Sequence, residues 1–323
     1  MIKKTEYLLP SNVIFGHMNP SEDDGGWDLN PNYVTGFSDA EACFHISIGK
    51  SSNYKSGLFV NPGFSIGLHK KDQALLELIQ STWSGVGKIT KQGKDSIQYR
   101  VLSIKDLGVI IDHFDKYPLT TQKRADYELF KQAFELIRNK EHLTNEGIKK
   151  IAGIKVSMNL GISGFLKVLF PNVIPVPRLI DKEQEIPGPH WIVGFVEGEG
   201  CFFVKISKSS KIDSRSQVIV GFQITQHSRD TRLINNMVTF FGCGRVEPYS
   251  YGSAVNFIVT KFSDITEKII PFFDKYPLRG SKAKDFAYFC KVVELMKKKA
   301  HLTDEGLKEI KKINALRAQE WIP

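Results

Sequence analysis

The chain contains an internal repeat, and this feature constrains its fold more than any other. The segment Tyr33–Phe44 (YVTGFSDAEACF) returns 158 residues later as Trp191–Phe202 (WIVGFVEGEGCF). In each copy an apolar stretch with helical spacing and one glycine ends in acidic residues, just before a strand-like pattern. Carboxylates are unfavourable at the C-terminal end of a helix, because the negative end of the helix dipole repels them. Their recurrence at matched positions indicates that these charges have a function.

Two further motifs are repeated along the chain. Phe114–Leu119 (FDKYPL) returns as Phe273–Leu278, and Lys140–Gly147 (KEHLTNEG) returns as Lys299–Gly306 (KAHLTDEG). Two long copies are too few and too large for a solenoid. The repeats therefore predict two homologous domains in one chain, which together imitate a symmetric dimer with a pseudo-two-fold axis.

The composition agrees with two soluble domains, and the chain carries an excess of positive charge. A chain of 323 residues can build two real cores, and its net charge is +9 with a pI of about 9.2. Such an excess of Lys and Arg fits either an ordinary solvated surface or binding to a polyanion such as nucleic acid. The four cysteines show no paired metal-ligand spacing, so reduced thiols are expected. No apolar run reaches the roughly 18 residues of a membrane-spanning helix, so no membrane partner is expected.

Each copy reads as helix-strand-strand-helix-strand-strand-helix with a further helix, which predicts the α+β class. Asp72 and Thr144 stand at expected helix starts, where their side chains can act as N-caps. In the first copy we expect strands at 43–50, 58–69, 87–91 and 96–103, and helices at 106–114 and 121–139. The expected domains are a loosely ordered extension (1–29), a first domain (30–159), an extended proline-rich linker (160–189) and a second domain (190–323).

Side-chain alternation separates the two faces of each predicted sheet. Apolar Phe44, Ile46 and Ile48 fall on one face of the first strand, and Cys43 and Ser47 fall on the other. The second copy alternates in the same way. The polar faces fit a plain solvent-exposed sheet or a surface that reads a groove of nucleic acid. Together the two four-stranded faces would span roughly 60 Å, or about 18 base pairs.

The two motifs and the repeated element order resemble the LAGLIDADG homing endonucleases of the single-chain, two-repeat kind. The Lys-Tyr-Pro-Leu and Lys-x-His-Leu-Thr-x-x-Gly segments resemble the group encoded within fungal mitochondrial introns. The similarity covers about residues 30–316. It implies a saddle of two antiparallel sheets, with the motif helices packed at the domain interface. Gly36 and Gly194 would allow these helices to approach closely.

The resemblance also implies where the catalytic groups lie. Glu41 and Glu199 would end the motif helices side by side and bind divalent metal, together with the backbone carbonyls of Ala40 and Gly198. Carboxylate oxygens suit Mg²⁺, which keeps several waters and takes other ligands from phosphates. We expect Mn²⁺ to substitute for Mg²⁺, and Ca²⁺ to support binding without cleavage. Asp39 and Glu197 occur two residues before these glutamates, and a structural role is expected for both.

Other positions of the family motif are matched unevenly in the two copies. Lys123 and Lys282 match the basic position of the active site, and Gln226 matches the polar position that orders water. The counterpart of Gln226 is Leu68, which cannot hydrogen-bond water, so the two sites should be unequal. Ala42 replaces the motif glycine that Gly200 retains, and a slight backbone adjustment is expected there.

The resemblance assigns DNA contact to the polar faces of the two sheets. The candidates in the first copy are Cys43, His45, Ser47, Lys50, Ser65, Gly67, Lys88, Gln98 and Arg100. Those in the second copy are Cys201, Phe203, Lys205, Ser207, Gln223, Thr225 and Arg245.

The leading hypothesis is a site-specific DNA endonuclease that makes a Mg²⁺-dependent double-strand break with short 3′ overhangs. The alternatives are an intron RNA maturase on the same scaffold, with its host intron RNA as partner, and a DNA-binding protein without cleavage. Both glutamates favour the enzyme, because neither alternative requires them. The expected partner is double-stranded DNA, with no protein partner, since one chain supplies both halves. A mitochondrial location follows from the resemblance alone.

Overall fold

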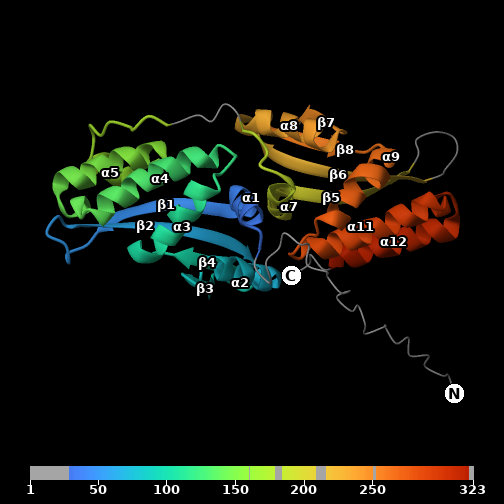
Figure 1. Ribbon diagram of the computed structural model, residues 1–323, viewed down its shortest axis with the longest axis horizontal. Helices are drawn as coiled ribbons and strands as arrows, with labels where there is room; N and C mark the ends of the chain where they lie inside the picture. The colour runs from blue at the N-terminus through green and yellow to red at the C-terminus, as the bar shows by residue number, and fades with distance from the viewer. Residues whose placement is uncertain (1–28, 160, 179–183, 209–215, 250–251, 320–323) are drawn as a thin grey trace, which may run out of the picture.

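The computed structural model describes residues 29–159, 161–178, 184–208, 216–249 and 252–319. The expected extension over 1–29 lies outside the described residues, apart from Leu29. Two similar halves stand side by side, and each consists of one four-stranded antiparallel sheet with helices packed on it (Figure 1). We call residues 31–157 the first repeat and residues 189–319 the second repeat. The predicted α+β class and saddle of two sheets are confirmed.

The first repeat has the predicted element order, with boundaries within about two residues of those expected. Its sheet order is β1-β2-β4-β3, with every neighbouring pair antiparallel. The elements are α1 (Pro31–Glu41), β1 (Ala42–Lys50), β2 (Leu58–His69), η1 (Lys70–Asp72), α2 (Gln73–Thr82), β3 (Lys88–Lys91), β4 (Ser96–Val101), α3 (Ile104–Lys116), α4 (Lys123–Arg138), η2 (Glu141–Leu143) and α5 (Asn145–Ser157).

The second repeat reproduces this order and sheet topology, β5-β6-β8-β7, with one interruption. Where the first repeat has α3, the second has a short helix, a π-helical turn and another short helix. Pro271 stands at the start of the last piece and lacks a backbone N–H, so the regular hydrogen-bond pattern cannot continue through it. The elements are α7 (Pro189–Glu199), β5 (Gly200–Lys208), β6 (Ser216–His227), η3 (Ser228–Asp230), α8 (Thr231–Phe241), β7 (Arg245–Pro248), β8 (Ala254–Val259), α9 (Phe262–Asp264), η4 (Ile265–Ile269), α10 (Ile270–Lys275), α11 (Lys282–Lys297), η5 (Ala300–Leu302) and α12 (Asp304–Gln319).

An aromatic cluster forms the core of each repeat, between the sheet and the helices. Phe44 on β1 is buried, and its ring centroid lies 5.2–5.5 Å from those of Phe64, Phe114, Tyr127 and Phe130. Phe202 on β5 occupies the equivalent place in the second repeat. Burying large rings in contact stabilises a fold strongly, since truncation of a core Phe typically costs about 3–5 kcal/mol. The sequence alternation therefore identified the core face correctly.

The motif helices α1 and α7 form the interface between the repeats (Figure 1). A Cβ atom placed on Gly36 would lie 2.0 Å from the backbone oxygen of Trp191, and one on Gly194 would lie 2.0 Å from that of Tyr33. The two backbones thus touch at both glycines, as predicted. Because each motif helix leads directly into the first strand of its sheet, this contact also sets how the two sheets start beside each other.

One of the two predicted helix caps is confirmed, and the other is wrong. Thr144 accepts a hydrogen bond from the backbone N of Gly147 at 3.0 Å, which caps α5. Asp72 occupies the N-cap position of α2, but its side chain makes no capping bond there. Its carboxylate instead accepts hydrogen bonds from Ser281, in the other repeat. Sequence spacing cannot reveal a partner 209 positions away.

The segment 160–189, expected to be extended, contains a short helix, α6 (Gly164–Leu169). This helix ends before Pro171, the first of the segment's prolines, so nothing in residues 164–169 prevents a helical turn. After the helix, Arg178 forms a salt bridge to Asp126 of α4 at 2.5 Å. Among the described helices, none is both long enough and apolar enough to cross a membrane.

Candidate active site

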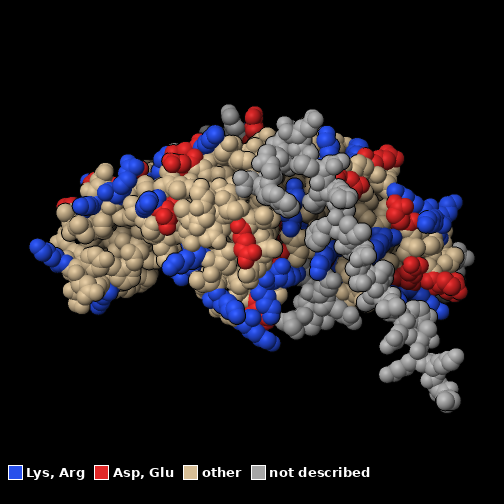
Figure 2. Space-filling model, turned by 60° about the horizontal axis from the view of Figure 1, so that its bottom comes forward, with Lys and Arg blue, Asp and Glu red and all other residues tan. Residues whose placement is uncertain are grey.

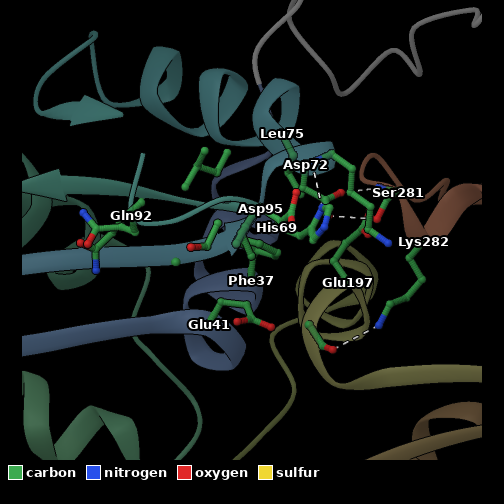
Figure 3. Close-up of a pocket in the computed structure, with 17 residues that line it drawn as sticks. Phe37, Glu41, His69, Asp72, Leu75, Gln92, Asp95, Glu197, Ser281 and Lys282 are labelled. Atoms are coloured by element: carbon green, nitrogen blue, oxygen red, sulfur yellow. Dashed lines mark hydrogen bonds between the residues drawn. The ribbon is translucent and has the colours of Figure 1, made fainter. Parts of the chain in front are cut away.

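Two carboxylates meet where the motif helices end. Glu41 is the last residue of α1, and Glu199 is the last residue of α7. A Cβ atom on Gly198 would lie 2.8 Å from Oε1 of Glu41, so the carboxylate of Glu41 lies against the end of the other motif helix. A groove of about 800 Å³ opens beside Glu41 and the end of α7 (Figure 3). The contact between the helix backbones is what brings these two acids together.

The surroundings of both glutamates make it costly for them to be charged together. Burial raises the pKa of Glu41, and burial together with the negative charge of Glu41 raises the pKa of Glu199 to about 7. The ammonium groups of Lys123 and Lys282 act in the opposite direction on both pKa values. A pair of partly buried carboxylates near positive charge is the environment expected for a functional site.

A lysine lies beside the end of each motif helix. Lys123 is the first residue of α4, and its Nζ donates to the backbone oxygens of Ser38 at 2.9 Å and Ala40 at 3.2 Å. Lys282 is the first residue of α11, and its Nζ donates to the backbone oxygens of Gly198 at 3.1 Å and of Gly200. Burial lowers the pKa of both lysines, and nearby carboxylates oppose this shift. The structure therefore brings both predicted lysines to the predicted carbonyls.

The donor groups at this place fit a hard divalent cation. Among the described residues, no three His, Cys, Asp or Glu side chains are grouped so that they could hold a metal ion by themselves. Two carboxylates, Glu41 and Glu199, are present, and the carbonyls of Ala40 and Gly198 lie at the negative ends of two helices. Such a partial oxygen shell suits Mg²⁺, which keeps waters and takes phosphate oxygens as further ligands.

Gln226 and Leu68 occupy matching places in the two sheets, and their surroundings differ. Gln226 is half-buried near the end of β6, and its Oε1 accepts a hydrogen bond from the backbone N of His227 at 2.8 Å. Leu68, at the matching place in β2, packs partly against the core and lines the groove beside Glu41. The two positions therefore differ in chemistry, and the inequality of the two halves of the site stays a prediction. The role of Gln226 in ordering water stays a prediction.

The first acid of each motif is buried and accepts hydrogen bonds from backbone N–H groups, as well as one from a side chain of the other motif helix. Asp39 accepts hydrogen bonds from the backbone N of Thr120 at 2.8 Å and of Thr121 at 3.0 Å. Glu197 accepts from the backbone N of Gly280 at 2.8 Å and from that of Arg279. Each acid thus holds the loop that leads to the lysine of its own repeat. The expected structural role of this pair agrees with these contacts.

The strand register gathers the candidate DNA contacts of the first sheet into rows. Cys43 pairs with Ser65, Ser65 with Arg100, and Arg100 with Lys88, so one row crosses all four strands. Paired residues share a face, because side chains alternate in step along antiparallel neighbours. Gly67 pairs with Gln98 in the next row, and His45 and Ser47 follow Cys43 along β1.

The second sheet repeats these rows with different chemistry. Cys201 pairs with Gln223, and Phe203, Lys205 and Ser207 follow along β5; Arg245 lies at the far end of the Cys201 row. The amide of Gln223 donates to Thr225 at 2.9 Å and to Asn256 at 3.1 Å. This network orders polar side chains at places where the first sheet has Ser65, Gly67 and Gln98. Asn256 was missed as a candidate, although it matches Gln98 in the repeat.

Lys50 does not belong to the polar face, so the strand register does not favour its assignment as a DNA contact, which stays a prediction. Its position is out of step with the alternation of Cys43 and Ser47, so it points to the opposite side of β1. There its Nζ lies 5.1 Å from the ring centroid of Phe165 in α6. Figure 2 shows Lys and Arg side chains gathered near the middle of the lower edge in that view, in the region of β3; α2 itself contains no Lys or Arg.

Comparison with known proteins identifies the repeats. The family model of the LAGLIDADG endonucleases matches the chain twice, at residues 34–134 and 192–293. Probable intron-encoded endonuclease 2 of Neurospora crassa is 40% identical over 294 residues, which is 87% of this chain and 64% of that protein. Probable intron-encoded endonuclease 3 of the same fungus is 41% identical over 87% of this chain and 53% of its own length. This chain thus spans between half and two thirds of these relatives.

Solved structures of similar chains share the whole fold. The I-SmaMI LAGLIDADG homing endonuclease bound to cleaved DNA is 44% identical, with a TM-score of 0.86 over 88% of this chain and 96% of that chain. The LAGLIDADG meganuclease I-CpaMI bound to uncleaved DNA is 47% identical, with a TM-score of 0.85 over 89% and 99%. Structures of I-SmaMI also include a double variant with two lysines replaced by alanine, and those lysines are separated by the same number of residues as Lys123 and Lys282. This chain belongs to the LAGLIDADG endonuclease family.

Proposed function

We propose that the protein is a site-specific homing endonuclease that makes a double-strand break with short 3′ overhangs in a long DNA target. The observation that carries the proposal is the pair Glu41 and Glu199 at the ends of touching helices, each helix end also contacted by a lysine. This arrangement has two halves, as cutting two strands requires. A binding protein without cleavage would have no use for burying two neighbouring carboxylates.

Each group of the site has a role in phosphodiester hydrolysis. Glu41 and Glu199, with the carbonyls of Ala40 and Gly198, would hold divalent metal. The metal would polarise the scissile phosphate, lower the pKa of the attacking water and stabilise the leaving oxygen. Lys123 and Lys282 add positive charge beside the phosphate. Gln226 can both donate to and accept from water, and it would orient water on its side of the site.

Magnesium is the metal we propose, with manganese as a substitute and calcium as an ion that supports binding without cleavage. Oxygen donors from carboxylates and carbonyls favour hard cations of this kind over softer ones. One structure of I-SmaMI is described as bound to an uncleaved DNA target in the presence of calcium ions. An uncleaved target in the presence of calcium supports the proposal that calcium allows this chain to bind DNA without cutting it.

The polar sheet faces would read the target through its major groove, apart from Lys50. The two faces differ: one carries Ser65, Gly67 and Gln98, and the other carries the network of Gln223, Thr225 and Asn256. Because base edges are distinguished by donors and acceptors, different faces read different half-sites. The proposed target is therefore asymmetric, with a length of about 18 base pairs.

The proposed organisation is two domains, 30–159 and 190–323, joined by 160–189, and the proposed location is the mitochondrion. Each match to the family model lies within one of these domains. Similar proteins include one called a mitochondrial protein in Saccharomyces cerevisiae, 25% identical over 209 residues, and others named for introns. One chain would act as its own pseudo-dimer, with no protein partner.

A randomised plasmid library tests the proposed function. Incubation with Mg²⁺ should cut a small set of related sequences on both strands, whereas Ca²⁺ should give binding without products. Glu146→Gln, an exposed change on α5, should cut the same set as the native protein. Absence of cut sequences, with binding to DNA or to structured intron RNA retained, would replace this proposal with one of the two non-cleaving alternatives.

A further inference from the structure

Each lysine of the site stands directly after a short backbone segment whose N–H groups are all directed at carboxylates. In the first repeat the segment is 120–122, before Lys123; in the second it is 279–281, before Lys282. The first two N–H groups of each segment donate to the motif acid of the same repeat, Asp39 or Glu197. The third N–H of each segment has a different partner.

The third N–H donates across the interface to an acid of the opposite repeat. The backbone N of Ser281 lies 2.6 Å from Oδ1 of Asp72, and its Oγ lies 3.0 Å from Oδ2 of the same carboxylate. The backbone N of Gln122 lies 2.7 Å from Oδ1 of Asp230. Figure 3 shows Asp72 reaching from the start of α2 to Ser281, next to Lys282.

The two contacts are equivalent by the pseudo-symmetry, although the flanking residues differ. Asp72 ends η1 and Asp230 ends η3, at matching places just before α2 and α8. The residues that receive them, Ser281 and Gln122, are unlike in chemistry, so the feature kept in both halves is the carboxylate and the backbone N–H. Ser281 and Gln122 are the N-cap residues of α11 and α4, and neither makes a capping bond with its side chain; the acid from the other repeat satisfies the backbone N–H of each.

A carboxylate at this place is favourable for two reasons. It satisfies an N–H at a helix start, and its charge lies at the positive end of the dipole of α4 or α11. Asp230 is buried and also accepts from Nε2 of Gln184 at 2.5 Å, which fixes its orientation. Asp72 is held by two bonds from one residue. Each contact is therefore well defined and not a loose surface ion pair.

We propose that Asp72 and Asp230 are positioning residues that act across the interface: Asp72 places Lys282, and Asp230 places Lys123. The proposal rests on the proposed endonuclease function for its catalytic consequence. Both repeats then fix the position of each lysine. Backbone carbonyls of its own repeat bind its Nζ atom, and the acid of the opposite repeat binds the backbone just before it. Any change in how the repeats meet would shift the lysines, so cutting is linked to correct closure of the interface.

A double-mutant cycle in strand-labelled, single-turnover cleavage tests this link. Asp72→Ala should slow cleavage by about 10–100-fold, as loss of supporting contacts around metal sites commonly does. With Lys282→Ala already present, Asp72→Ala should add little; with Lys123→Ala present, its full effect should remain. Asp230→Ala should show the reverse pairing, and the two Asp variants should slow opposite strands. Asp72→Asn keeps an oxygen acceptor for the N–H of Ser281 and should retain most of the rate.

Amide hydrogen exchange in the metal-free protein tests the contact without relying on cleavage. Asp72→Ala should speed exchange at Ser281 and leave Gln122 unchanged, and Asp230→Ala should do the opposite. DNA affinity in Ca²⁺ should stay within a few-fold of native for both. Equal slowing of both strands, additivity within the matched lysine pair, or unchanged exchange at Ser281 and Gln122 would overturn the proposal. An unaltered exchange pattern would refute the positioning role of Asp72 and Asp230 but not the endonuclease function. A native protein that cuts no DNA would refute the proposed function.

Discussion

At the scale of single residues, burial decides the protonation of groups around the motif helices. His113 of α3 packs edge-on against Trp83, and its Nε2 lies 3.1 Å from Oγ1 of Thr35 on α1. Thr35 donates its hydroxyl proton to the backbone oxygen of Tyr117 at 3.0 Å, so Nε2 of His113 is the donor in their contact. Burial lowers the pKa of His113 to about 4. The imidazole is therefore neutral in the folded protein at physiological pH.

The lowered pKa of His113 predicts how stability depends on pH. Between about pH 6.5 and 4 the unfolded chain takes up a proton on this residue and the folded chain does not, so stability falls as the pH falls. The full effect is about 3 kcal/mol and is absent above pH 6.5. In urea unfolding, His113→Gln should be less stable at pH 7 but should lose less stability on acidification. Parallel curves for the two proteins would contradict this assignment.

The chemical difference between Gln226 and Leu68, at matching places in the two repeats, predicts unequal cutting of the two strands. At limiting Mg²⁺ one strand should be cut first, so that a nicked intermediate accumulates. Gln226→Leu should slow one strand by about 10–100-fold, because it removes a group that can hold water near the metal. Leu68→Gln should do little harm. Strand-labelled time courses provide the measurement, and equal rates for both strands in native protein and Gln226→Leu would remove the inferred role of Gln226.

At the scale of elements, the repeat made most of the architecture predictable from the sequence. Alternation in β1 and β5 identified Phe44 and Phe202 as core, and the motif glycines identified the touching faces of α1 and α7. These features are local or periodic, so they are visible in one chain. The side chain partner of Asp72 and the contact of Lys50 with Phe165 were not predictable, because both depend on residues far away in sequence. The same holds for the network around Asn256.

The contact between α1 and α7 predicts a sharp penalty at Gly36. In Gly36→Ala the new Cβ would lie 2.0 Å from a backbone oxygen of Trp191, so the helices must separate. We expect a loss of about 3 kcal/mol or more in the free energy of unfolding, with loss of cleavage. Gly108→Ala in α3 is the matched control, because a Cβ atom there meets nothing within 4 Å. This variant should gain as much as about 1 kcal/mol in the free energy of unfolding, since Ala favours the helix over Gly. Similar stabilities of the two variants in chemical denaturation would refute the close contact.

At the scale of the whole molecule, the two repeats share one fold and are related by pseudo-symmetry, but their side chains differ in chemistry. Matched pairs such as Glu41 and Glu199, or Lys123 and Lys282, preserve the symmetry that cutting two strands demands. The sheet faces and the Gln226 and Leu68 positions depart from it. One chain can vary its halves independently, which a dimer of identical subunits cannot do. The net charge of +9 favours approach of the whole molecule to a polyanion.

The basic charge predicts a steep dependence of DNA binding on salt. Each neutralised phosphate contributes about −0.9 to the slope of log K against log salt, so affinity should fall by roughly 10³-fold or more between 50 and 200 mM for about six or more contacts. Lys205→Gln, on the polar face of β5, should reduce the slope by about one if it contacts a phosphate. Lys50→Gln should leave it unchanged, because Lys50 lies on the opposite face against Phe165. A slope near zero in fluorescence titrations would argue against a large electrostatic contact.

Glu41 and Glu199 are proposed to form one metal-dependent cleavage site. Cleavage of the target selected from the plasmid library should therefore be measured for Glu41→Gln and Glu199→Gln in Mg²⁺, with DNA affinity measured in parallel. An amide keeps the shape of each side chain but holds a divalent cation poorly. We predict that neither variant makes a double-strand break, while both bind the target within a few-fold of the native affinity. Double-strand cleavage at the native rate by either variant would show that the two glutamates do not form such a site.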